Sequence, residues 1–383
     1  MTKIMDELRT ETIELLSSLI GIRSENPPGS EDGIPEFIER YLADRDIDSE
    51  RVPLENGRSS IVSRIAGRLP GSYVLCGHID TVPAEGSQWT TNPFFAHREG
   101  RYLRGLGAAD MKSGVAVLIA LACDIKKRAL ALSHDIVLAL TADEEGSYRG
   151  ATSVASSGLI DDARFLLIAE PTGGAVYLGQ RGELWVEATF RGRAAHGSTP
   201  SSGINAILPA SEFCLRLADE SRSFPEIPGL GRTSLNVGLI EGGRRVNIVP
   251  DTATVHLDSR AVTTAERERV LLRIREAGSE LSEKWGAQFS YEIYNDRAPI
   301  LSDPKAPEIV RFLEVNHDLT GRPIRPEIAP YSTDAVAIVP QTSIPLIIYG
   351  PGSIEQAHRP DEYVDLDALF EVMEVIGSFL VPR

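Results

Sequence analysis

The chain has 383 residues, of which 42% are hydrophobic and 25% charged, as in a globular protein large enough for two domains. Its formal charge of −16 argues against a nucleic-acid or anionic-membrane partner, because both bind basic surfaces. No apolar run reaches membrane-spanning length and the first residues lack a signal-peptide pattern, so we expect a cytoplasmic protein. The three scattered cysteines are typical of buried thiols in a reducing compartment.

The first part of the chain alternates helical patterns with continuous apolar runs. Helical spacing is predicted for residues 4–22, 31–42 and 111–128, and strands for 60–65, 73–76, 135–140 and 164–169. Strands that are apolar on both faces are typical of a sheet covered by helices. The sequence therefore predicts an α/β fold with a helix-covered sheet.

The pattern changes near residue 177. Residues 182–191 alternate, with Leu184, Val186, Ala188 and Phe190 on one face, as in an antiparallel strand with one buried face. A helix at 205–220, strands at 233–240 and 253–260, a helix at 264–285 and a strand at 288–294 follow. This β-α-β-β-α-β order is typical of ferredoxin-like α+β domains. We therefore expect an inserted domain at 177–293.

The α/β pattern returns after the insertion. A helix is predicted at 308–320, a strand at 344–349 and a final helix at 366–380. We expect 1–176 and 294–383 to form one domain together.

Imidazole and carboxylate side chains follow several of the apolar strands. They are His78, Asp110, Glu144, Glu145, Glu170 and His358. Ligands of open α/β sheets bind beyond the carboxyl ends of the strands, so these residues can converge. Two histidines and several carboxylates without cysteine fit zinc, with cobalt or manganese as alternatives, better than magnesium or calcium. A carboxylate shared by two such ions would give a dinuclear site that activates water.

Two short patterns bear on the chemistry. His78 and Asp80 are two residues apart at a strand end, so Asp80 can contact the imidazole and fix its tautomer. Glu144 and Glu145 diverge as neighbours, so one can bind metal while the other acts as general base. In isolation the first pattern is more often a structural pair, and the second a solvated turn. The other strand-end ligands favour the metal interpretation.

Five motifs carry a resemblance to a known family. They are GHIDTVP at 77–83, GAADMKSG at 107–114, DEEG at 143–146, EPT at 170–172 and AHRPDE at 357–362. The chain resembles the dinuclear zinc amidohydrolases and peptidases of family M20, which include acetylornithine deacetylase, succinyl-diaminopimelate desuccinylase and glutamate carboxypeptidase. The resemblance extends over nearly the whole chain.

The resemblance implies a role for each ligand. Asp110 would bridge two zinc ions, His78 and Glu170 would complete one, Glu145 and His358 the other, Glu144 would be the base and Asp80 would orient His78. The inserted segment would be the family's dimerisation (lid) domain, making the protein a homodimer. His196, in AAHGS at 194–198, would stabilise the oxyanion in a partner subunit's site, and Asn247 and Arg260 would contact substrate.

The resemblance also implies a substrate class. GPGSIEQAHRPDEY at 350–363 and YSTD at 331–334 are similar to the acetylornithine deacetylase branch, so Ser332 and Thr333 would contact a small N-acyl amino acid whose linear amide is hydrolysed. Glu170 stands at a position where the family's aminopeptidases have aspartate in common. This difference points away from the aminopeptidase branch. A desuccinylase, a glutamate-type carboxypeptidase and an amidohydrolase of a specialised substrate stay open. A non-catalytic binding protein and a metallophosphatase are alternatives from other classes.

Overall fold

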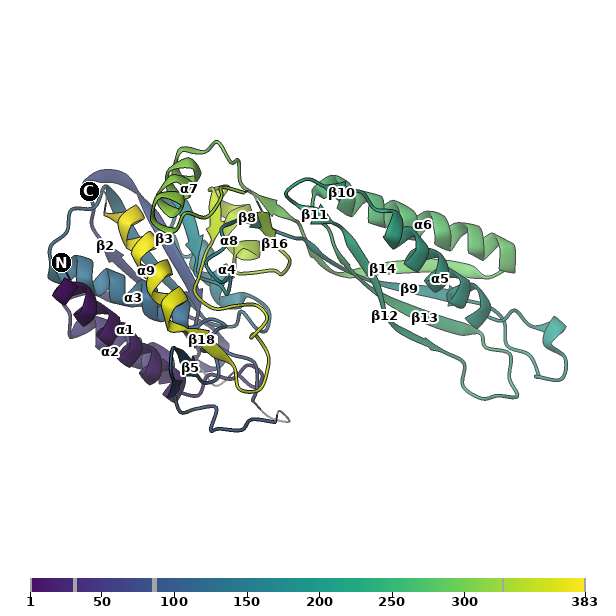
Figure 1. The fold of residues 1–383 in the computed structure, drawn as a ribbon. Coiled ribbons are helices and arrows are strands. Elements are labelled where there is room, and N and C mark those ends of the chain that lie inside the picture. The colour runs from purple at the N-terminus through teal and green to yellow at the C-terminus, as the bar shows by residue number, and fades with distance from the viewer. Residues whose placement is uncertain (1, 30–32, 85–87, 326, 382–383) are drawn as a thin grey trace. The chain divides into compact units, whose positions relative to one another are not determined.

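The computed structural model describes residues 2–29, 33–84, 88–325 and 327–381 (Figure 1). The chain divides into two compact units. Unit 1 comprises Met1–Gly179, Ser302–Ala329 and Thr333–Arg383, and unit 2 comprises Gln180–Leu301 and Pro330–Ser332. The long segment of unit 2 ends at Leu301, later than the expected residue 293. The strand predicted at 288–294 continues to Arg297.

Unit 1 is built on a mixed sheet. Its strands follow the order β1-β2-β6-β3-β7-β17-β8-β15, with β16 paired to β8. β3 runs parallel to β6 and β7, and β17 runs parallel to β7. The strands are β1 (Ser49–Pro53), β2 (Ser59–Ile65), β3 (Leu69–His78), β6 (His134–Thr141), β7 (Ala163–Ile168), β8 (Tyr177–Gln180), β15 (Ile300–Leu301), β16 (Glu327–Ala329) and β17 (Leu346–Ile348).

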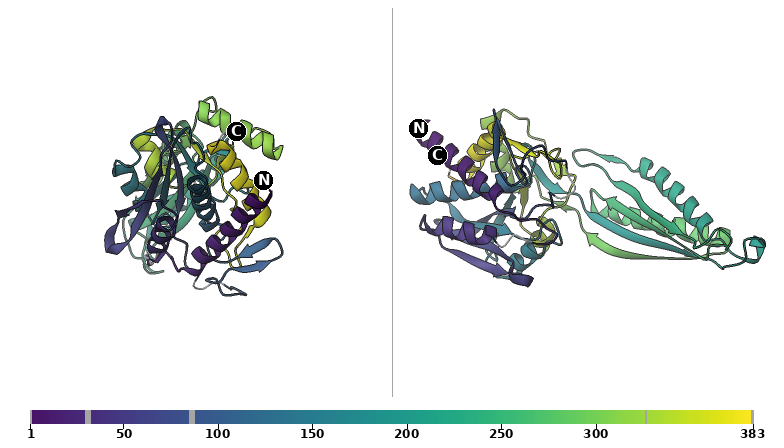
Figure 2. Two further views of the ribbon diagram at one scale, coloured as in Figure 1. Left: turned by 90° about the vertical axis from the view of Figure 1, so that its left-hand side faces the viewer. Right: turned by 90° about the horizontal axis from the view of Figure 1, so that it is seen from below.

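Helices cover both faces of this sheet, as the end-on view in Figure 2 shows. α3 packs on β3 and β6 beside α1 and α9, while α4 packs on β2 and β6 and against α8. Along β3, Leu75 joins the core of α1, α3 and α9, and its neighbours Val74 and Cys76 are fully buried on the other face. The helices are α1 (Thr2–Gly21), α2 (Gly33–Ala43), α3 (Lys112–Lys127), α4 (Arg149–Ser156), α7 (Pro307–Thr320), α8 (Ala335–Thr342) and α9 (Leu366–Leu380).

A small sheet completes unit 1. Its order is β18-β5-β4, and it joins β4 (His97–Glu99) and β5 (Tyr102–Arg104) to β18 (Tyr363–Asp365), which is far away in sequence. Tyr363 pairs with Arg104 in an antiparallel ladder. The segment that follows β5 therefore lies beside the segment that precedes β18. A short 3-10 helix, η1 (Glu55–Gly57), precedes β2.

Unit 2 has the predicted ferredoxin-like arrangement. Its sheet is wholly antiparallel in the order β12-β13-β9-β14, from β9 (Glu183–Arg191), β12 (Ser234–Gly242), β13 (Thr252–Arg260) and β14 (Gln288–Arg297). α5 (Ile207–Ser223) and α6 (Thr264–Trp285) pack on one face, against the buried side chains of Leu184, Val186, Ala188 and Phe190. η2 (Pro200–Ser202) and a two-stranded sheet of β10 (Glu226–Ile227) and β11 (Gly231–Arg232) lie in its loops.

The α/β fold class predicted from the sequence is confirmed. The long predicted elements are present with small differences at their ends, whereas the short elements β1, β4, β5, β18, α4 and α8 were not predicted. The predicted start of the second helix, Glu31 and Asp32, lies outside the described residues. Within the ranges that the structure describes, no helix has the length and apolar character needed to span a membrane.

Candidate metal centre

The expected ligands meet where three parallel strands end. His78 is the last residue of β3 and pairs with Thr141, the last residue of β6, and Glu170 follows β7 by two residues. Because β3 lies between β6 and β7, these carboxyl ends are adjacent. Gly114 in α3 permits close packing here, since a Cβ at this position would lie 2.1 Å from the carbonyl oxygen of Ala169.

The six strand-end residues form three overlapping groups of potential ligands. In each group, one ligand atom from every residue lies within 4.8 Å of the others. The groups are His78, Asp110 and Glu170; His78, Glu144 and Glu145; and Asp110, Glu145 and His358. Asp110 belongs to two groups, and its carboxylate oxygens lie 3.0 Å from His78 Nε2 and 3.4 Å from His358 Nε2.

The tautomer of His78 follows from its hydrogen bonds. Nδ1 lies 3.0 Å from the backbone carbonyl oxygen of Asp80, whereas the nearer carboxylate oxygen of Asp80 lies 3.7 Å away. A carbonyl oxygen can only accept, so Nδ1 carries a proton, and Nε2 is the ring nitrogen that faces Asp110 and Glu170. The sequence predicted that Asp80 would orient His78, but the main chain of Asp80 makes the closer contact.

The carboxylate of Asp80 instead binds the main chain after β6. Oδ1 accepts the backbone N–H of Glu144 at 3.2 Å, and Oδ2 accepts the backbone N–H of Glu145 at 3.1 Å. Oδ2 also accepts a hydrogen bond from Asn26 Nδ2 at 3.0 Å. Asp80 is fully buried, so these bonds are shielded from water and fix the path of the Glu144-Glu145 segment.

Burial dominates the electrostatics of the acidic residues. It raises the pKa of Glu144 and of Glu170 well above their usual range, where nearby carboxylates raise these pKa values further and His78 opposes the shift. Burial also raises the pKa of Glu145, against the hydrogen bond from His358. Ionised carboxylates in such a site need a nearby positive charge.

The histidines and Asp110 favour charged forms. Burial opposes ionisation of Asp110, but hydrogen bonds from His358 and His78 hold its pKa well below its usual range. Hydrogen bonds to Asp110 and Glu145 raise the pKa of His358 to about 10. His358 Nε2 lies 3.1 Å from Glu145 Oε1, so one imidazole contacts two carboxylates.

These residues fit divalent metal ions by their chemistry. Four carboxylates and two imidazoles converge, and within the described part of the chain no lysine or arginine forms an ion pair with Glu144, Glu145 or Glu170. Nitrogen and oxygen donors without thiolates suit zinc, cobalt or manganese. The donor set therefore leaves the neutralising charge to be supplied by cations.

The structure adds Glu362, for which the sequence suggested no role. Its buried carboxylate accepts three backbone N–H groups, from Gly107 at 2.9 Å, Ala109 at 2.7 Å and Asp110 at 2.9 Å. Its own carbonyl oxygen accepts the N–H of Gly105 at 3.0 Å. Glu362 thus connects the segment after His358 to the segment that carries Asp110. Its place in the AHRPDE motif was the only signal in the sequence.

His196 and Asn247 lie side by side in unit 2. His196 is exposed, and its main chain forms an isolated β-bridge with Ile248. Gly197 donates its N–H to the carbonyl oxygen of Asn247 at 2.8 Å. His196 Nδ1 accepts the backbone N–H of Ser198 at 3.2 Å, so the proton of the neutral imidazole is on Nε2.

The remaining predicted substrate contacts belong to both units. Arg260, at the end of β13, forms ion pairs with Glu183 at 3.0 Å and Asp258 at 2.9 Å. Ser332 belongs to unit 2 and Thr333 to unit 1. Thr333 is buried, with Oγ1 accepting the N–H of Ala335 at 3.2 Å.

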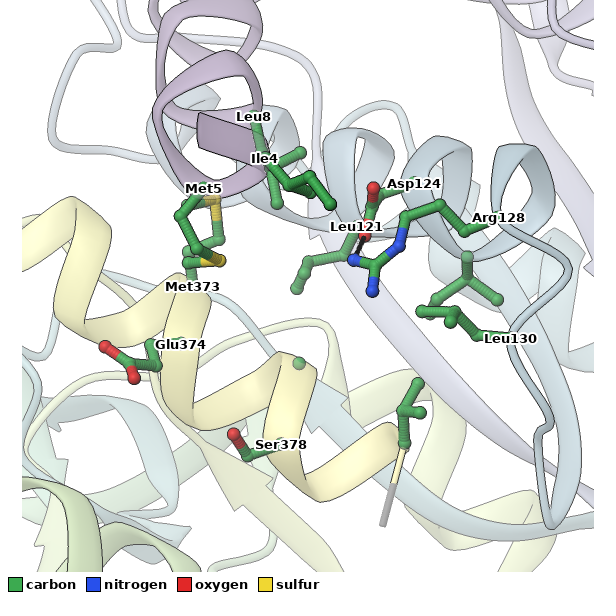
Figure 3. A pocket seen from close by; sticks show the side chains of 13 residues that line it. Ile4, Met5, Leu8, Leu121, Asp124, Arg128, Leu130, Met373, Glu374 and Ser378 are labelled. Atoms are coloured by element: carbon green, nitrogen blue, oxygen red, sulfur yellow. Dashed lines mark hydrogen bonds and ion pairs between the residues drawn. The ribbon is translucent and has the colours of Figure 1, made fainter. Parts of the chain in front are cut away.

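A pocket of about 260 Å³ in unit 1 is unrelated to these residues. α1, α3 and α9 line it with mostly apolar side chains, among them Leu8, Leu121 and Met373 (Figure 3). Asp124 on α3 and Arg128, the residue after α3, also line it and form an ion pair at 2.8 Å. None of the strand-end ligands contributes to its wall.

Comparisons with known proteins agree with the resemblance. Acetylornithine deacetylase from Proteus mirabilis (strain HI4320) is 30% identical over 340 residues, which cover 87% of this chain and 85% of that protein. A probable succinyl-diaminopimelate desuccinylase from Staphylococcus aureus (strain MSSA476) is 27% identical over 396 residues and 95% of each chain. A solved dinuclear metal-binding M20 peptidase from Bacillus subtilis has a TM-score of 0.77 at 18% identity, with 98% of each chain covered.

The family model of peptidase family M20/M25/M40 matches residues 74–381. This range includes all five motifs and every strand-end ligand. The family predicted from the motifs is thus confirmed: the chain belongs to peptidase family M20/M25/M40, a family of hydrolases.

Proposed function

We propose that this protein is a dinuclear metal-dependent amidohydrolase that removes the acyl group from a small N-acyl amino acid, as an acetylornithine deacetylase does. The observation that carries the proposal is the sharing of Asp110 between two groups of potential ligands. One carboxylate with an oxygen toward each group is the arrangement that a bridging ligand requires.

Two of these groups match the ligand roles that the family resemblance implies. Asp110 would be shared by two metal ions, of which His78 and Glu170 would hold one and Glu145 and His358 the other. When bound, such ions lower the pKa of a water molecule and polarise the carbonyl group of the substrate. Zinc is the first candidate, with cobalt or manganese as alternatives, because the donors are imidazole and carboxylate.

Glu144 is the general base. It is buried beside the ligands, and only its backbone N–H is held by Asp80, so its carboxylate is available to a substrate. Glu144 takes a proton from the attacking water and returns it to the departing amine. The raised pKa that burial gives this carboxyl makes its carboxylate a stronger base, which suits removal of a proton from water.

His196 donates a hydrogen bond to the oxyanion. Since Nδ1 accepts from Ser198, the exposed Nε2–H is the free donor of the neutral ring. The carbonyl oxygen of Asn247 supports the same loop by accepting the Gly197 N–H. By the family resemblance, Asn247, Arg260, Ser332 and Thr333 contact the substrate. By the family resemblance, His196 acts in the site of a partner subunit of a homodimer.

Acetylornithine-type deacylation is favoured because the 30% identical relative has that activity in its name. A desuccinylase is the second candidate, since a relative that covers 95% of each chain has that name. Both hydrolyse a linear amide, so the acyl group distinguishes them.

A substrate panel tests the proposal. The metal-free protein would be loaded with zinc, cobalt or manganese and assayed on N-acetyl and N-succinyl amino acids, dipeptides and a phosphomonoester. We expect metal-dependent release of acetate from N-acetylornithine or another N-acetyl amino acid, abolished by a chelator. Cleavage of succinyl substrates or dipeptides alone would replace the deacetylase by the desuccinylase or the carboxypeptidase. Absence of turnover with every metal and substrate would contradict the proposal.

A further inference from the structure

We propose that Asn26 is a positioning residue that holds the Glu144-Glu145 segment in place through Asp80 and Asp143. It lies in the turn that follows α1, outside all five sequence motifs. The structural part of this proposal is independent of the reaction, and its consequence for turnover rests on the proposed function of Glu144.

The side chain of Asn26 joins two buried carboxylates. Its Nδ2 donates one hydrogen bond to Asp80 Oδ2 at 3.0 Å and another to Asp143 Oδ1 at 3.0 Å. Carboxylates only accept, so the amide nitrogen rather than the amide oxygen must face them. Asn26 is 6% exposed, and Asp80 and Asp143 are almost completely buried. A neutral donor thus satisfies two anions that follow β3 and β6.

The main chain fixes Asn26 at this place. Its N–H donates to the carbonyl oxygen of Thr81 at 2.8 Å, and Thr81 donates its N–H to the carbonyl oxygen of Ser24 at 2.9 Å. The turn after α1 is therefore bound to the segment that follows His78. Asn26 consequently approaches the carboxylates from a fixed backbone.

Asp80 transmits the constraint to the proposed base and ligand. Each of its oxygens accepts one backbone N–H, from Glu144 at 3.2 Å and from Glu145 at 3.1 Å. If Asn26 stopped binding Oδ2, the Asp80 carboxylate could rotate away from both N–H groups. The backbone of Glu144 and Glu145 would then lose its fixed direction.

Asp143, the residue before Glu144, holds the start of the same segment. It has a left-handed φ of +69°, which is uncommon for a residue with a side chain. Its carboxylate accepts hydrogen bonds from Arg58 at 3.0 Å and from Arg149 Nε at 2.6 Å, in addition to Asn26. The turn that presents Glu144 is thus stabilised by Asn26 and Arg58 from distant segments and by Arg149 from the start of α4.

Gly146 supplies independent support. A Cβ at this position would lie 2.6 Å from Asp143 Oδ1 and 2.9 Å from Asn26 Nδ2. Both distances are too short for carbon contacts, so a side chain there would displace the Asn26–Asp143 hydrogen bond. The glycine of the DEEG motif is therefore explained by the space that the Asn26 amide needs.

Hydrogen exchange tests the structural part without any substrate. Asn26→Ala, Asn26→Asp and Gly146→Ala would be compared with Asn316→Asp in the metal-free protein. Asn316 is a matched control, since it is 5% exposed in unit 1 and donates to Tyr349 Oη at 3.1 Å. We expect the Glu144 and Glu145 amides to exchange at least tenfold faster in the three test variants and unchanged in the control. Unchanged exchange in folded Asn26→Ala would overturn the proposal.

Steady-state kinetics test the consequence for turnover. With a substrate identified by the panel, we expect Asn26→Asp to lower kcat about 100-fold, since a small displacement of a reacting group has effects of that size. KM should change less than about threefold, because Asn26 is 6% exposed and its amide nitrogen is bound to Asp80 and Asp143. Retained kcat despite faster exchange would refute the link to catalysis. If the panel finds no substrate, the proposed function fails and the exchange result still decides the structural part.

Discussion

At the scale of single residues, Asp80 shows what a sequence pattern can and cannot determine. The two-residue spacing from His78 correctly predicted that Asp80 lies next to the imidazole. It could not determine which atoms make contact, because β3 ends at His78 and the strand alternation does not continue to Asp80. The carboxylate therefore turns to Glu144 and Glu145, and the backbone carbonyl binds His78.

The cysteines give a prediction about pH dependence. Burial raises the pKa of Cys123 to about 12, so its thiol stays protonated at pH 8. We expect Cys123 to react with iodoacetamide roughly a thousandfold more slowly in the native protein than in urea, because so little thiolate is present. The native rate should rise as the pH approaches 12. Mass spectrometry of the Cys123 peptide measures this, and a native rate near that of the unfolded chain at pH 8 would refute the buried state.

At the scale of elements, the pairing of β5 with β18 brings the metal-site loops together. Arg104 pairs with Tyr363. The residue before Tyr363 is Glu362, whose carboxylate binds the Gly107–Asp110 segment. The two loops that carry Asp110 and His358 are thus connected by the Glu362 carboxylate, which accepts main-chain N–H groups. The geometry of a shared ligand depends on this connection.

Replacing Glu362 by glutamine tests this connection. Oε1 accepts two N–H groups and Oε2 accepts one, so either orientation of the new amide places an NH2 group against a backbone donor. We expect a loss of about 2 kcal/mol in the free energy of unfolding, as for a buried donor without its acceptor. Zinc binding should weaken at both metal positions, because Asp110 belongs to two ligand groups.

Urea unfolding and zinc titration of Glu362→Gln provide the measurements. Glu266→Gln is the control, since Glu266 is a similarly buried carboxylate in unit 2. Equal stability and zinc affinity in wild type and Glu362→Gln would show that the three hydrogen bonds do not position Asp110.

Long elements could be predicted from the sequence because their own periodicity specifies them. α6 was predicted at 264–285 and begins and ends at those residues, with Thr263 capping its start and Gly286 ending it. Three-residue strands such as β4, β5 and β18 are too short to show a period, and pairing between distant segments stabilises them. α4 has only eight residues, and its apolar side chains, Ala151, Val154 and Ala155, are small, so its pattern was equally weak.

At the scale of the whole molecule, the order of elements predicted more than local patterns could. Strand-end positions correctly indicated that His78, Glu144, Glu145 and Glu170 would converge, because parallel strands end at one edge of the sheet. Asn26 could not be predicted, since only the folded chain brings the turn after α1 to Asp80 and Asp143. The structure shows the two units, whereas the roles of the unit 2 residues stay predictions.

The expected homodimer is a prediction at the same scale. β12 is an edge strand of unit 2 with exposed Leu239 and Ile240, which are 59% and 50% exposed. Unpaired edges with apolar side chains are typical of interfaces between chains. We expect a mass twice the 41.7 kDa of the chain, and a monomer for Leu239→Asp.

Analytical ultracentrifugation checks this prediction. Leu272→Asp is the control, because Leu272 is 40% exposed on α6, which packs at the β14 side of the sheet. This variant should stay dimeric. A monomeric wild type would contradict the homodimer, and dimeric Leu239→Asp would contradict an interface at β12.

The proposed site would hold two metal ions around Asp110, and Glu144 would act on the water without being needed to bind them. Metal analysis and turnover of Glu144→Gln, measured on the same zinc-loaded sample, separate these two roles. We predict two zinc ions per chain, as in wild type, with kcat reduced by at least about 100-fold, in the range of general-base catalysis. Near-normal turnover, or loss of the metal ions together with activity, would show that Glu144 is not the general base.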